Sequence, residues 1–284
     1  AWIFAAITMP WILFAWIYFG SPIPATYFAK LSQGTLAISR GFAPGFFARI
    51  ISGLGQWEWQ IHYILAIFGC AGLLKWGKSW GLFFAWLVLY FTSYTVMGVT
   101  SYFWYYAPLF LGLLVCSGAG VEAISRVVKT NKKLPTWLPG LAIAGLFVLL
   151  FAANTHNFLL FRQETDFRME IFRAAGQWLK KYTPPGSAVG TLEVGIMGFF
   201  SNRNMIDFAG LLQPEIARQL HSSDDYETGA LYAHQTYQPE FFVLNTGVFP
   251  QLENQLSIEN CKKIQRFKGK KFSAPWDLLV YDCR

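Results

Sequence analysis

Three basic side chains lie in one polar segment of an otherwise apolar half of the chain. Lys30, Arg40 and Arg49 fall between residues 20 and 60, where Glu58 is the only acidic residue. Lysine and arginine bind anions by charge and by donated hydrogen bonds, and both effects grow where water is scarce. The segment therefore predicts a site for an anionic group at a membrane surface.

Two further titratable residues near this segment could contribute chemistry. Glu58 lies between Trp57 and Trp59, and a carboxylate there could pair with one of the cations or assist an acceptor hydroxyl as a general base. His62 follows one turn later, within an apolar run where a titratable group is unusual. A hydrogen-bonded structural role remains the simpler interpretation of His62, and a solvated interfacial charge is the simpler one of Glu58.

The composition places these residues in a membrane protein. The chain of 284 residues is 54% hydrophobic and 18% aromatic, and it contains several apolar runs of membrane-spanning length. Residues 1–155 carry nine Lys and Arg against two acids, whereas residues 156–284 carry fourteen against fourteen. We predict a multi-pass α-helical membrane domain over 1–155, followed by a small extracytoplasmic α/β domain over 156–284. A basic membrane part favours anionic lipid as a partner and argues against nucleic acid.

The apolar runs predict about five transmembrane helices, over residues 2–19, 61–74, 80–97, 107–124 and 137–153. Short basic turns stay in the cytoplasm, so the turns at 75–78 and 126–133 orient the spans. This orientation places the loop 20–60 and the C-terminal domain outside the cytoplasm. The three cations of that loop oppose the rule and need a local reason. Because the chain starts inside an apolar run, we also expect sequence upstream of Ala1.

The C-terminal part alternates helix and strand patterns. Helices are expected over 167–181, 193–200 and 214–221, and strands over 188–192, 205–208, 241–244, 261–267 and 278–281. This alternation predicts a small layered α/β domain. Outside the cytoplasm, Cys261 and Cys283 could form a disulfide or remain two free thiols. Cys70 and Cys116 are expected to be small buried apolar residues.

Three strings, in the same order along nearly the whole chain, resemble one known family. Residues 22–30, Pro-Ile-Pro-Ala-Thr-Tyr-Phe-Ala-Lys, are similar to the Pro-x-Pro-Asn-Thr-x-x-Ala-Lys loop of bacterial GT-C glycosyltransferases, with Ala25 in place of Asn. These enzymes use polyprenyl-phosphate sugars and are related to arabinofuranosyltransferases and protein mannosyltransferases. Residues 103–108, Phe-Trp-Tyr-Tyr-Ala-Pro, resemble their Trp-Tyr-Tyr-x-Pro signature, and residues 188–198 and 206–214 resemble their periplasmic domain.

The resemblance implies the C-terminal half of a glycosyltransferase in the cytoplasmic membrane. Such an enzyme moves a sugar from a lipid-linked donor to a glycan or protein acceptor outside the cytoplasm. The family's general base is an acid in the first outward loop, and no Asp precedes Asp166 here, so the catalytic carboxylate is expected upstream and Glu58 is only a candidate. Lys30, Arg40 and Arg49 would hold the donor phosphate.

The resemblance also suggests contacts for the sugar, the carrier and the acceptor. Glu193 and Asp207 are candidates for acceptor binding, with structural roles in turns as the alternative. The expected lining of a substrate channel, which an aromatic belt at the membrane surface would explain equally well, consists of Tyr27, His62, Tyr102, Trp104, Tyr105 and Tyr106.

The sequence predicts no cofactor and no metal ligands in this chain, and a divalent cation in the complete enzyme is left open without support. The absence of GxSxG, HExxH and Walker patterns argues against serine hydrolases, metalloproteases and P-loop ATPases. The alternative function is a non-catalytic membrane subunit whose outward α/β domain binds a partner protein in a membrane complex. A transporter is disfavoured, because no predicted span contains paired charges.

Overall fold

The computed structural model describes residues 2–77, 80–130, 135, 137–163, 166–221 and 223–284. Two compact units result: one combines Ala1–Ser39 with Asp166–Arg284, and the other is Arg40–Thr165. Of the two basic turns used to orient the spans, Lys78, Lys132 and Lys133 lie outside the described residues.

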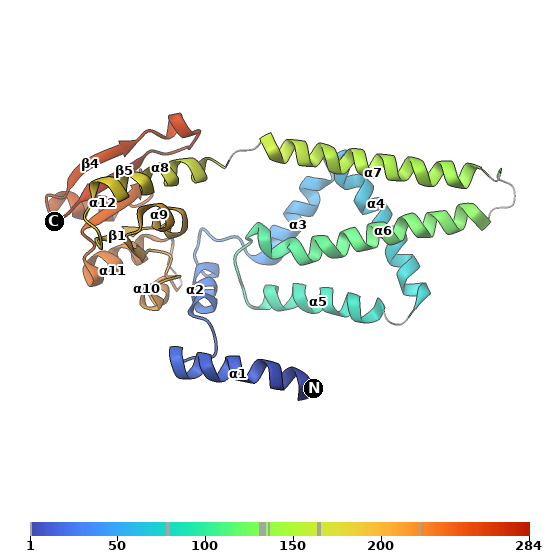
Figure 1. Cartoon of the computed structure of the whole chain (residues 1–284), viewed down its shortest axis with the longest axis horizontal. Coiled ribbons are helices and arrows are strands. Elements are labelled where there is room, and N and C mark those ends of the chain that lie inside the picture. The colour runs from blue at the N-terminus through green and yellow to red at the C-terminus, as the bar shows by residue number, and fades with distance from the viewer. Residues whose placement is uncertain (1, 78–79, 131–134, 136, 164–165, 222) are drawn as a thin grey trace. The chain divides into compact units, whose positions relative to one another are not determined.

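The unit Arg40–Thr165 is helical (Figure 1). Its elements are α3 (Phe42–Gly53), α4 (Trp57–Trp76), α5 (Trp80–Val96), the 3-10 helix η1 (Phe103–Tyr106), α6 (Ala107–Thr130) and α7 (Leu138–Gln163). Four of the predicted spans correspond to α4, α5, α6 and α7, and α7 continues past residue 153 to Gln163. Part of the loop 20–60 forms α3, which an isolated antiparallel bridge between Gly41 and Thr100 joins to the segment before η1.

Two glycines allow α4 and α6 to pack backbone to backbone. A Cβ on Gly69 would lie 1.7 Å from the carbonyl oxygen of Cys116, and one on Gly120 would lie 2.0 Å from that of Leu65. Any side chain at either position would force the helices apart. Small residues at crossing points are the usual means by which helices associate in membranes, where lipid gives little hydrophobic drive.

Three helical segments in the described part of the chain are long and apolar enough to cross a membrane. They are α1 (Trp2–Phe19), η1 together with α6 (Phe103–Thr130), and the segment that begins with α7 at Leu138. α5 is apolar but shorter, and α4 carries Glu58 in its first turn and Lys75 in its last. The exposed side chains of α1 are mainly large and apolar, as expected for a lipid-facing surface.

The other unit contains α1, α2 (Ala25–Gly34) and a five-stranded mixed sheet with its helices. The sheet is built from β1 (Ala188–Thr191), β2 (Asn204–Asp207), β3 (Phe241–Asn245), β4 (Lys262–Phe267) and β5 (Leu278–Asp282). The remaining elements are α8 (Phe167–Tyr182), α9 (Val194–Ser201), α10 (Pro214–Gln219), α11 (Glu227–Tyr237), α12 (Pro250–Ile258) and η2 (Gly269–Phe272). The five predicted strands are confirmed, whereas α11 and α12 were not predicted.

The strand order is β2-β1-β3-β5-β4. β1 pairs in parallel with both β2 and β3, while β5 pairs antiparallel with β3 and β4. β1 thus has a parallel neighbour on each side, β2 on one and β3 on the other. Thr191 of β1 is in register with Asp207 and with Val243. The carboxyl ends of β1, β2 and β3 therefore meet at one edge of the sheet.

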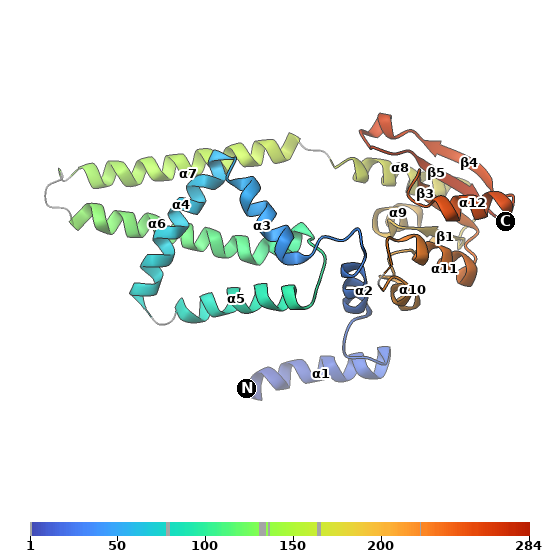
Figure 2. The same ribbon diagram turned by 180° about the vertical axis from the view of Figure 1, so that it is seen from behind.

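The sheet is covered on both faces (Figure 2). Phe242 and Leu244 of β3 point into a core shared with α11 and α12, whereas Phe241 and Val243 point into a core shared with α8 and α9. Successive strand residues face opposite sides, so both sides of a fully covered strand must be apolar. This explains why residues 241–244 form a continuous apolar run in the sequence.

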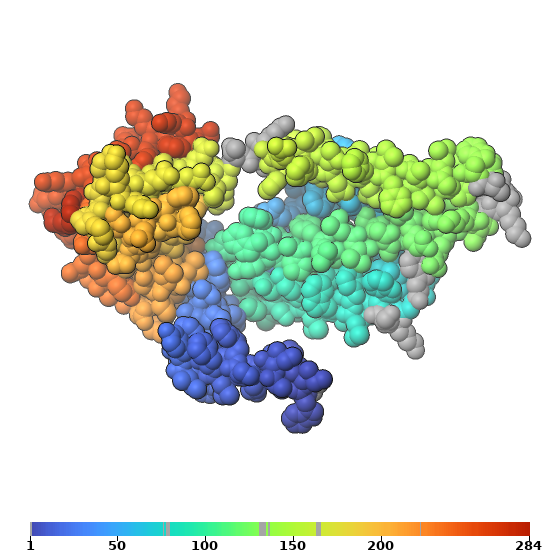
Figure 3. Space-filling model, viewed as in Figure 1, coloured from blue at the N-terminus to red at the C-terminus, as the bar shows by residue number. Residues whose placement is uncertain are grey.

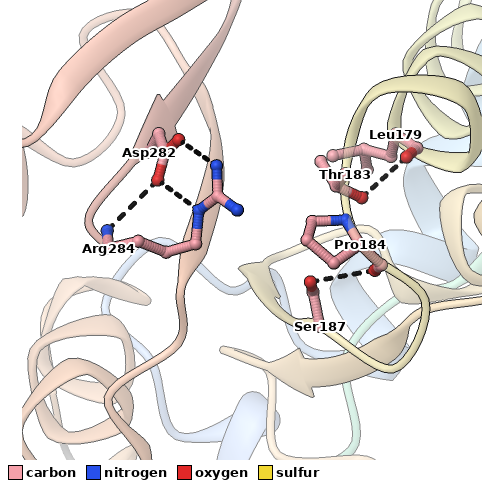
Figure 4. A network of polar contacts seen from close by, with 6 residues as sticks. All are labelled: Leu179, Thr183, Pro184, Ser187, Asp282 and Arg284. Atoms are coloured by element: carbon pink, nitrogen blue, oxygen red, sulfur yellow. Dashed lines mark hydrogen bonds and ion pairs between the residues drawn. The ribbon is translucent and has the colours of Figure 1, made fainter.

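Side-chain contacts close the ends of several elements. Thr183 Oγ1 donates a hydrogen bond to the carbonyl of Leu179 (2.6 Å) at the end of α8, and the Arg284 guanidinium binds the Asp282 carboxylate after β5 (Figure 4). Cys261 and Cys283, which precede β4 and follow β5, form the disulfide that was one of the two expectations. Because β4 and β5 pair antiparallel, this disulfide lies at the open end of that hairpin.

Candidate functional site

A cavity of about 510 Å³ lies within the helical unit, where α3, α4, η1 and α6 meet. Its volume falls in the range of small-molecule sites. Aromatic side chains form most of the wall, and Ser52, Gln56 and Arg49 supply polar atoms. The lining residues are Arg49, Ser52, Gly53, Gln56, Trp59, Tyr63, Phe103, Trp104, Ala107 and Phe110.

Arg49 gives this cavity its charge. It is the only charged residue among the described residues that line it, and its guanidinium carbon lies 6.0 Å from the centre of the Phe103 ring. The face of an aromatic ring attracts a cation without neutralising it. The guanidinium is therefore oriented by Phe103 while its donors remain suited to an anion, which it can bind through two parallel hydrogen bonds.

The junction between α3 and α4 shapes one side of the cavity. A Cβ on Gly53 would lie 2.3 Å from the Tyr63 hydroxyl oxygen, so a larger residue at this position would require the Tyr63 ring to shift away from the end of α3. The same hydroxyl lies 3.4 Å from the carbonyl oxygen of Ile50, to which it donates. Trp59 and Tyr63, one turn apart on α4, stack with ring centres 6.3 Å apart. The polar turn and the aromatic face of α4 thereby form one wall.

The aromatic residues of η1 divide between the cavity and the core. Trp104 lines the cavity and stacks on Tyr102, with ring centres 4.6 Å apart and planes 8° from parallel. Tyr106 is fully buried, and its hydroxyl donates to the carbonyl of Phe42 (2.9 Å). Tyr105 packs against Tyr94 and is not among the lining residues. Of the aromatic residues predicted for a channel, Trp104 is thus in direct contact with the cavity and Tyr102 supports it.

Glu58 and His62 lie on a different face of α4 from the cavity. The Glu58 carboxylate is almost fully buried and forms a hydrogen bond with Nδ1 of His156 on α7. His62 Nδ1 lies 3.1 Å from Ser117 Oγ on α6, and both residues are buried. Neither residue lines the cavity. The structure therefore does not bring Glu58 together with Arg49, and it reveals a contact between Glu58 on α4 and His156 on α7 that was not predicted from the sequence.

Lys30 belongs to the other unit, where it lies close to the turn after β2. Its ammonium donates to Gln33 Oε1 (2.8 Å), and Gln33 Nε2 donates to the carbonyl of Ala209 (3.0 Å). Burial lowers the pKa of Lys30, and the nearby Asp207 carboxylate partly opposes this shift. The predicted phosphate ligand is thus engaged in the docking of α2 against the α/β domain.

Asp207 organises the turn that receives α2. Its fully buried carboxylate accepts hydrogen bonds from the backbone N–H groups of Ala209 (2.8 Å) and Leu211 (2.7 Å). Burial raises the pKa of Asp207, while the backbone donors and Lys30 lower it in part. Both oxygens hold backbone groups, which is the structural alternative considered for this residue.

The other predicted site residues are dispersed. Glu193 precedes α9 at the same sheet edge as Asp207, where it makes no side-chain cap to the helix. Arg40 is exposed, and its carbonyl accepts from the Ser101 backbone N–H (2.8 Å), while its side chain does not line the cavity. Tyr27 lies on α2 and packs edge to face against Phe28. Among the described residues, no group of three or more His, Cys, Asp or Glu side chains could hold a metal ion.

Several residues of the cavity were missed from the sequence. The turn between α3 and α4 was not predicted, so the sequence did not bring together the lining residues at this turn and beyond it, Ser52, Gln56 and Tyr63. Phe110 lies in a predicted span, where an aromatic residue is not unusual. The available signal was the spacing of Gln56, Trp59 and Tyr63, which puts them on one helical face. His156 could have been noticed as a second titratable residue beside an apolar run.

Comparison with known proteins adds one match. The model of a domain of unknown function (DUF8728) matches residues 159–281, a range that starts near the end of α7 and ends in β5. No curated protein and no solved structure matches the chain.

Proposed function

We propose that the chain is the C-terminal part of a membrane glycosyltransferase that uses a polyprenyl-phosphate sugar as donor. The observation that carries this proposal is the cavity in which the Arg49 guanidinium lies among aromatic walls and whose described lining residues include no acid. A ligand that fits must be anionic at one point and apolar or sugar-like elsewhere. A phosphate linked to a prenyl chain on one side and a sugar on the other has this chemistry.

Arg49 would act on the leaving group. An acceptor hydroxyl attacks the anomeric carbon of the sugar, the bond between that carbon and the phosphate oxygen breaks, and configuration inverts. The departing phosphate gains negative charge, and the Arg49 guanidinium, which Phe103 orients, would stabilise that charge by attraction and by donated hydrogen bonds. The proton of the acceptor hydroxyl passes to a general base that we expect upstream of this chain.

The aromatic walls would hold the rest of the donor. Trp59, Trp104 and Phe110 offer flat apolar faces, and Trp and Tyr rings combine such a face with a polar atom. Ser52 and Gln56 supply hydrogen-bonding groups close to Arg49 in the sequence and in the same cavity wall. The site therefore provides apolar contact for isoprene units and polar contact for the sugar or the phosphate.

The membrane placement in this proposal follows the five predicted spans, with the C-terminal domain outside the cytoplasm. Three helical segments long and apolar enough to cross a membrane support it. The Cys261–Cys283 disulfide supports the outer location, because stable disulfides are typical of compartments outside the reducing cytoplasm.

The direct test is substitution of Arg49 in the complete gene product. Arg49→Ala should lower kcat/KM for a polyprenyl-phosphate sugar by roughly tenfold or more, because it removes a charged hydrogen bond to the departing phosphate and such a bond contributes about 1.5–3 kcal/mol. Arg49→Lys should recover part of the loss. Arg40→Ala is the matched control, since Arg40 is an exposed arginine of the same unit that does not line the cavity. Equal effects of Arg49→Ala and Arg40→Ala would contradict the assignment.

A second measurement separates the enzyme from the non-catalytic alternative. The complete gene product, reconstituted in vesicles, is given a donor with a radiolabelled sugar and a membrane fraction that supplies acceptors. Transfer of label that Arg49→Ala reduces is expected for the enzyme. Binding of polyprenyl phosphate without any transfer would favour a non-catalytic subunit.

A further inference from the structure

The α/β domain has a dense basic segment that the proposed transferase does not use. Six of the ten residues from 262 to 271 are Lys or Arg, and none of the ten is acidic. The segment covers β4, an edge strand of the sheet, and most of η2. We call residues 262–271 the basic segment. Its exposed cations are Lys262, Lys263, Arg266, Lys268, Lys270 and Lys271.

The six cations of the basic segment outnumber the two nearby acids, Asp277 and Asp282, which also lie close to Lys268 and Lys262. Asp277 forms an ion pair with Arg266 and also accepts a hydrogen bond from the Gly269 backbone N–H (2.7 Å). Asp282 is bonded to Arg284, which lies outside the segment. Lys263 and Lys271 lie over the rings of Tyr281 and Phe272, which orient an ammonium group without removing its charge. The segment therefore keeps a net positive surface, and in the space-filling view the chain between β4 and β5 projects from its surroundings (Figure 3).

The position of η2 is fixed by aromatic packing against the start of α8. Trp276, which follows η2, stacks on Phe172 with ring centres 5.5 Å apart and lies 5.8 Å from the Phe167 ring. Gly269 lies directly against the Trp276 carbonyl, where a Cβ would approach to 2.1 Å. The lysines of η2 are thus held beside the first turns of α8, and they are not carried on a long free loop.

The chain itself brings the start of α8 close to the end of α7. α7 ends at Gln163 and α8 begins at Phe167, and four residues of extended chain span at most about 14 Å. Exposed apolar side chains continue along α7 through Phe158 and Phe161, and Arg162 is the first charged residue after them. Where α7 crosses a membrane, the start of α8 and the adjoining η2 must therefore lie near the headgroups.

We propose that the basic segment binds anionic phospholipid headgroups of the membrane that α7 enters, and so holds the α/β domain against the membrane surface. Basic residues next to a membrane-spanning helix are attracted to anionic lipid, and each contributes while it lies within about a Debye length of the surface. Because α7 tethers the domain, the headgroups are present at a high effective concentration. This inference needs α7 in a membrane but does not depend on sugar transfer.

The test is amine footprinting of the complete protein in nanodiscs, with lysine labelling read by mass spectrometry. One set of nanodiscs contains phosphatidylcholine alone, and the other contains about one third phosphatidylglycerol. We expect labelling of Lys268, Lys270 and Lys271 to fall roughly fivefold in the anionic nanodiscs. The protection should be lost in about 0.5 M salt, which screens exposed charges.

Lys180 and Lys181 are the internal control. They are an exposed adjacent pair at the far end of α8, and Lys181 lies over the Tyr182 ring much as Lys271 lies over that of Phe272. Their labelling should be the same in both lipids. The variant Lys270→Gln with Lys271→Gln should weaken the protection of Lys268, whereas Lys180→Gln with Lys181→Gln should leave it unchanged.

Three results would overturn the proposal. The first is equal labelling of the basic segment in both kinds of nanodisc. The second is equal protection of Lys180 and Lys181, which would indicate adsorption without a specific face. The third is protection by a soluble polyanion such as polyphosphate in phosphatidylcholine nanodiscs, with none by phosphatidylglycerol, which would assign the segment to an anionic polymer.

Discussion

Lys30 and Arg49 come from the same polar stretch of sequence but have opposite surroundings. Lys30 donates to Gln33 and lies near the buried carboxylate of Asp207, so its charge serves the packing of α2. Arg49 lines a cavity whose described lining contains no acid, and its guanidinium lies over the Phe103 ring. The difference shows that an acid close in space, which sequence distance does not reveal, separates a structural cation from one suited to a ligand.

The same comparison applies to the acids. Asp207 and Glu58 are both buried, and each is committed to partners: backbone N–H groups in the first case and His156 in the second. A buried carboxylate is costly unless its oxygens accept hydrogen bonds, so in both cases these partners explain how the acid can be buried.

The largest expected effect is on the turn at Asp207, which lies close to Lys30. Asp207→Ala leaves the buried N–H groups of Ala209 and Leu211 without their acceptor and should destabilise the α/β domain by about 3 kcal/mol. Hydrogen exchange of these two amides, read together with thermal unfolding, measures it. Asp207→Asn keeps one acceptor oxygen and should cost about half as much. Slow exchange at both amides in Asp207→Ala would show that the turn does not need the carboxylate.

The α/β domain was largely predictable because its signals are local. The apolar run at 241–244 and the amphipathic pattern at 167–181 became β3 and α8 with nearly the expected bounds. α11 and α12 were missed because their sequences give only weak amphipathic patterns. α12 is held in part by a contact distant in sequence, since the Glu227 carboxylate accepts from the backbone N–H groups of Gln251 and Leu252 at its start.

The candidate site was only partly predictable because it depends on which helix faces meet. The sequence identified Arg49 and Trp104 as site residues, and the structure places both on the cavity. It also grouped them with Lys30, because spacing along the chain does not show that α2 packs on the turn after Asp207 through Gln33. The wall formed by Tyr63 depends on Gly53, and such a close approach leaves no periodic signal in the sequence.

A smaller effect is expected at the aromatic wall of the cavity that Arg49 lines. Trp104→Ala removes an aromatic wall of the cavity and should weaken binding of polyprenyl phosphate about tenfold, because a large aromatic contact contributes on the order of 1–2 kcal/mol. Trp86→Ala is the control, since Trp86 on α5 is similarly exposed (44% against 49%) and does not line the cavity. Equilibrium binding to the purified protein measures both variants. Equal losses would mean that the carrier contacts the helical unit without using this cavity.

The smallest expected effect is a pH dependence at Lys30. Its pKa is lowered by burial below the ordinary value of 10.5, so over the interval between the two values the unfolded protein binds more protons than the folded one. Stability should therefore rise with pH across that interval, as the half-buried ammonium loses its proton. Lys30→Met should abolish this rise, whereas Lys180→Met, at an exposed position on α8, should preserve it. Thermal unfolding of the three proteins from about pH 7.5 to pH 10 measures this pH dependence. A constant difference in stability between wild type and Lys30→Met across that range would contradict the prediction, because Lys30 would then titrate alike in the folded and the unfolded protein.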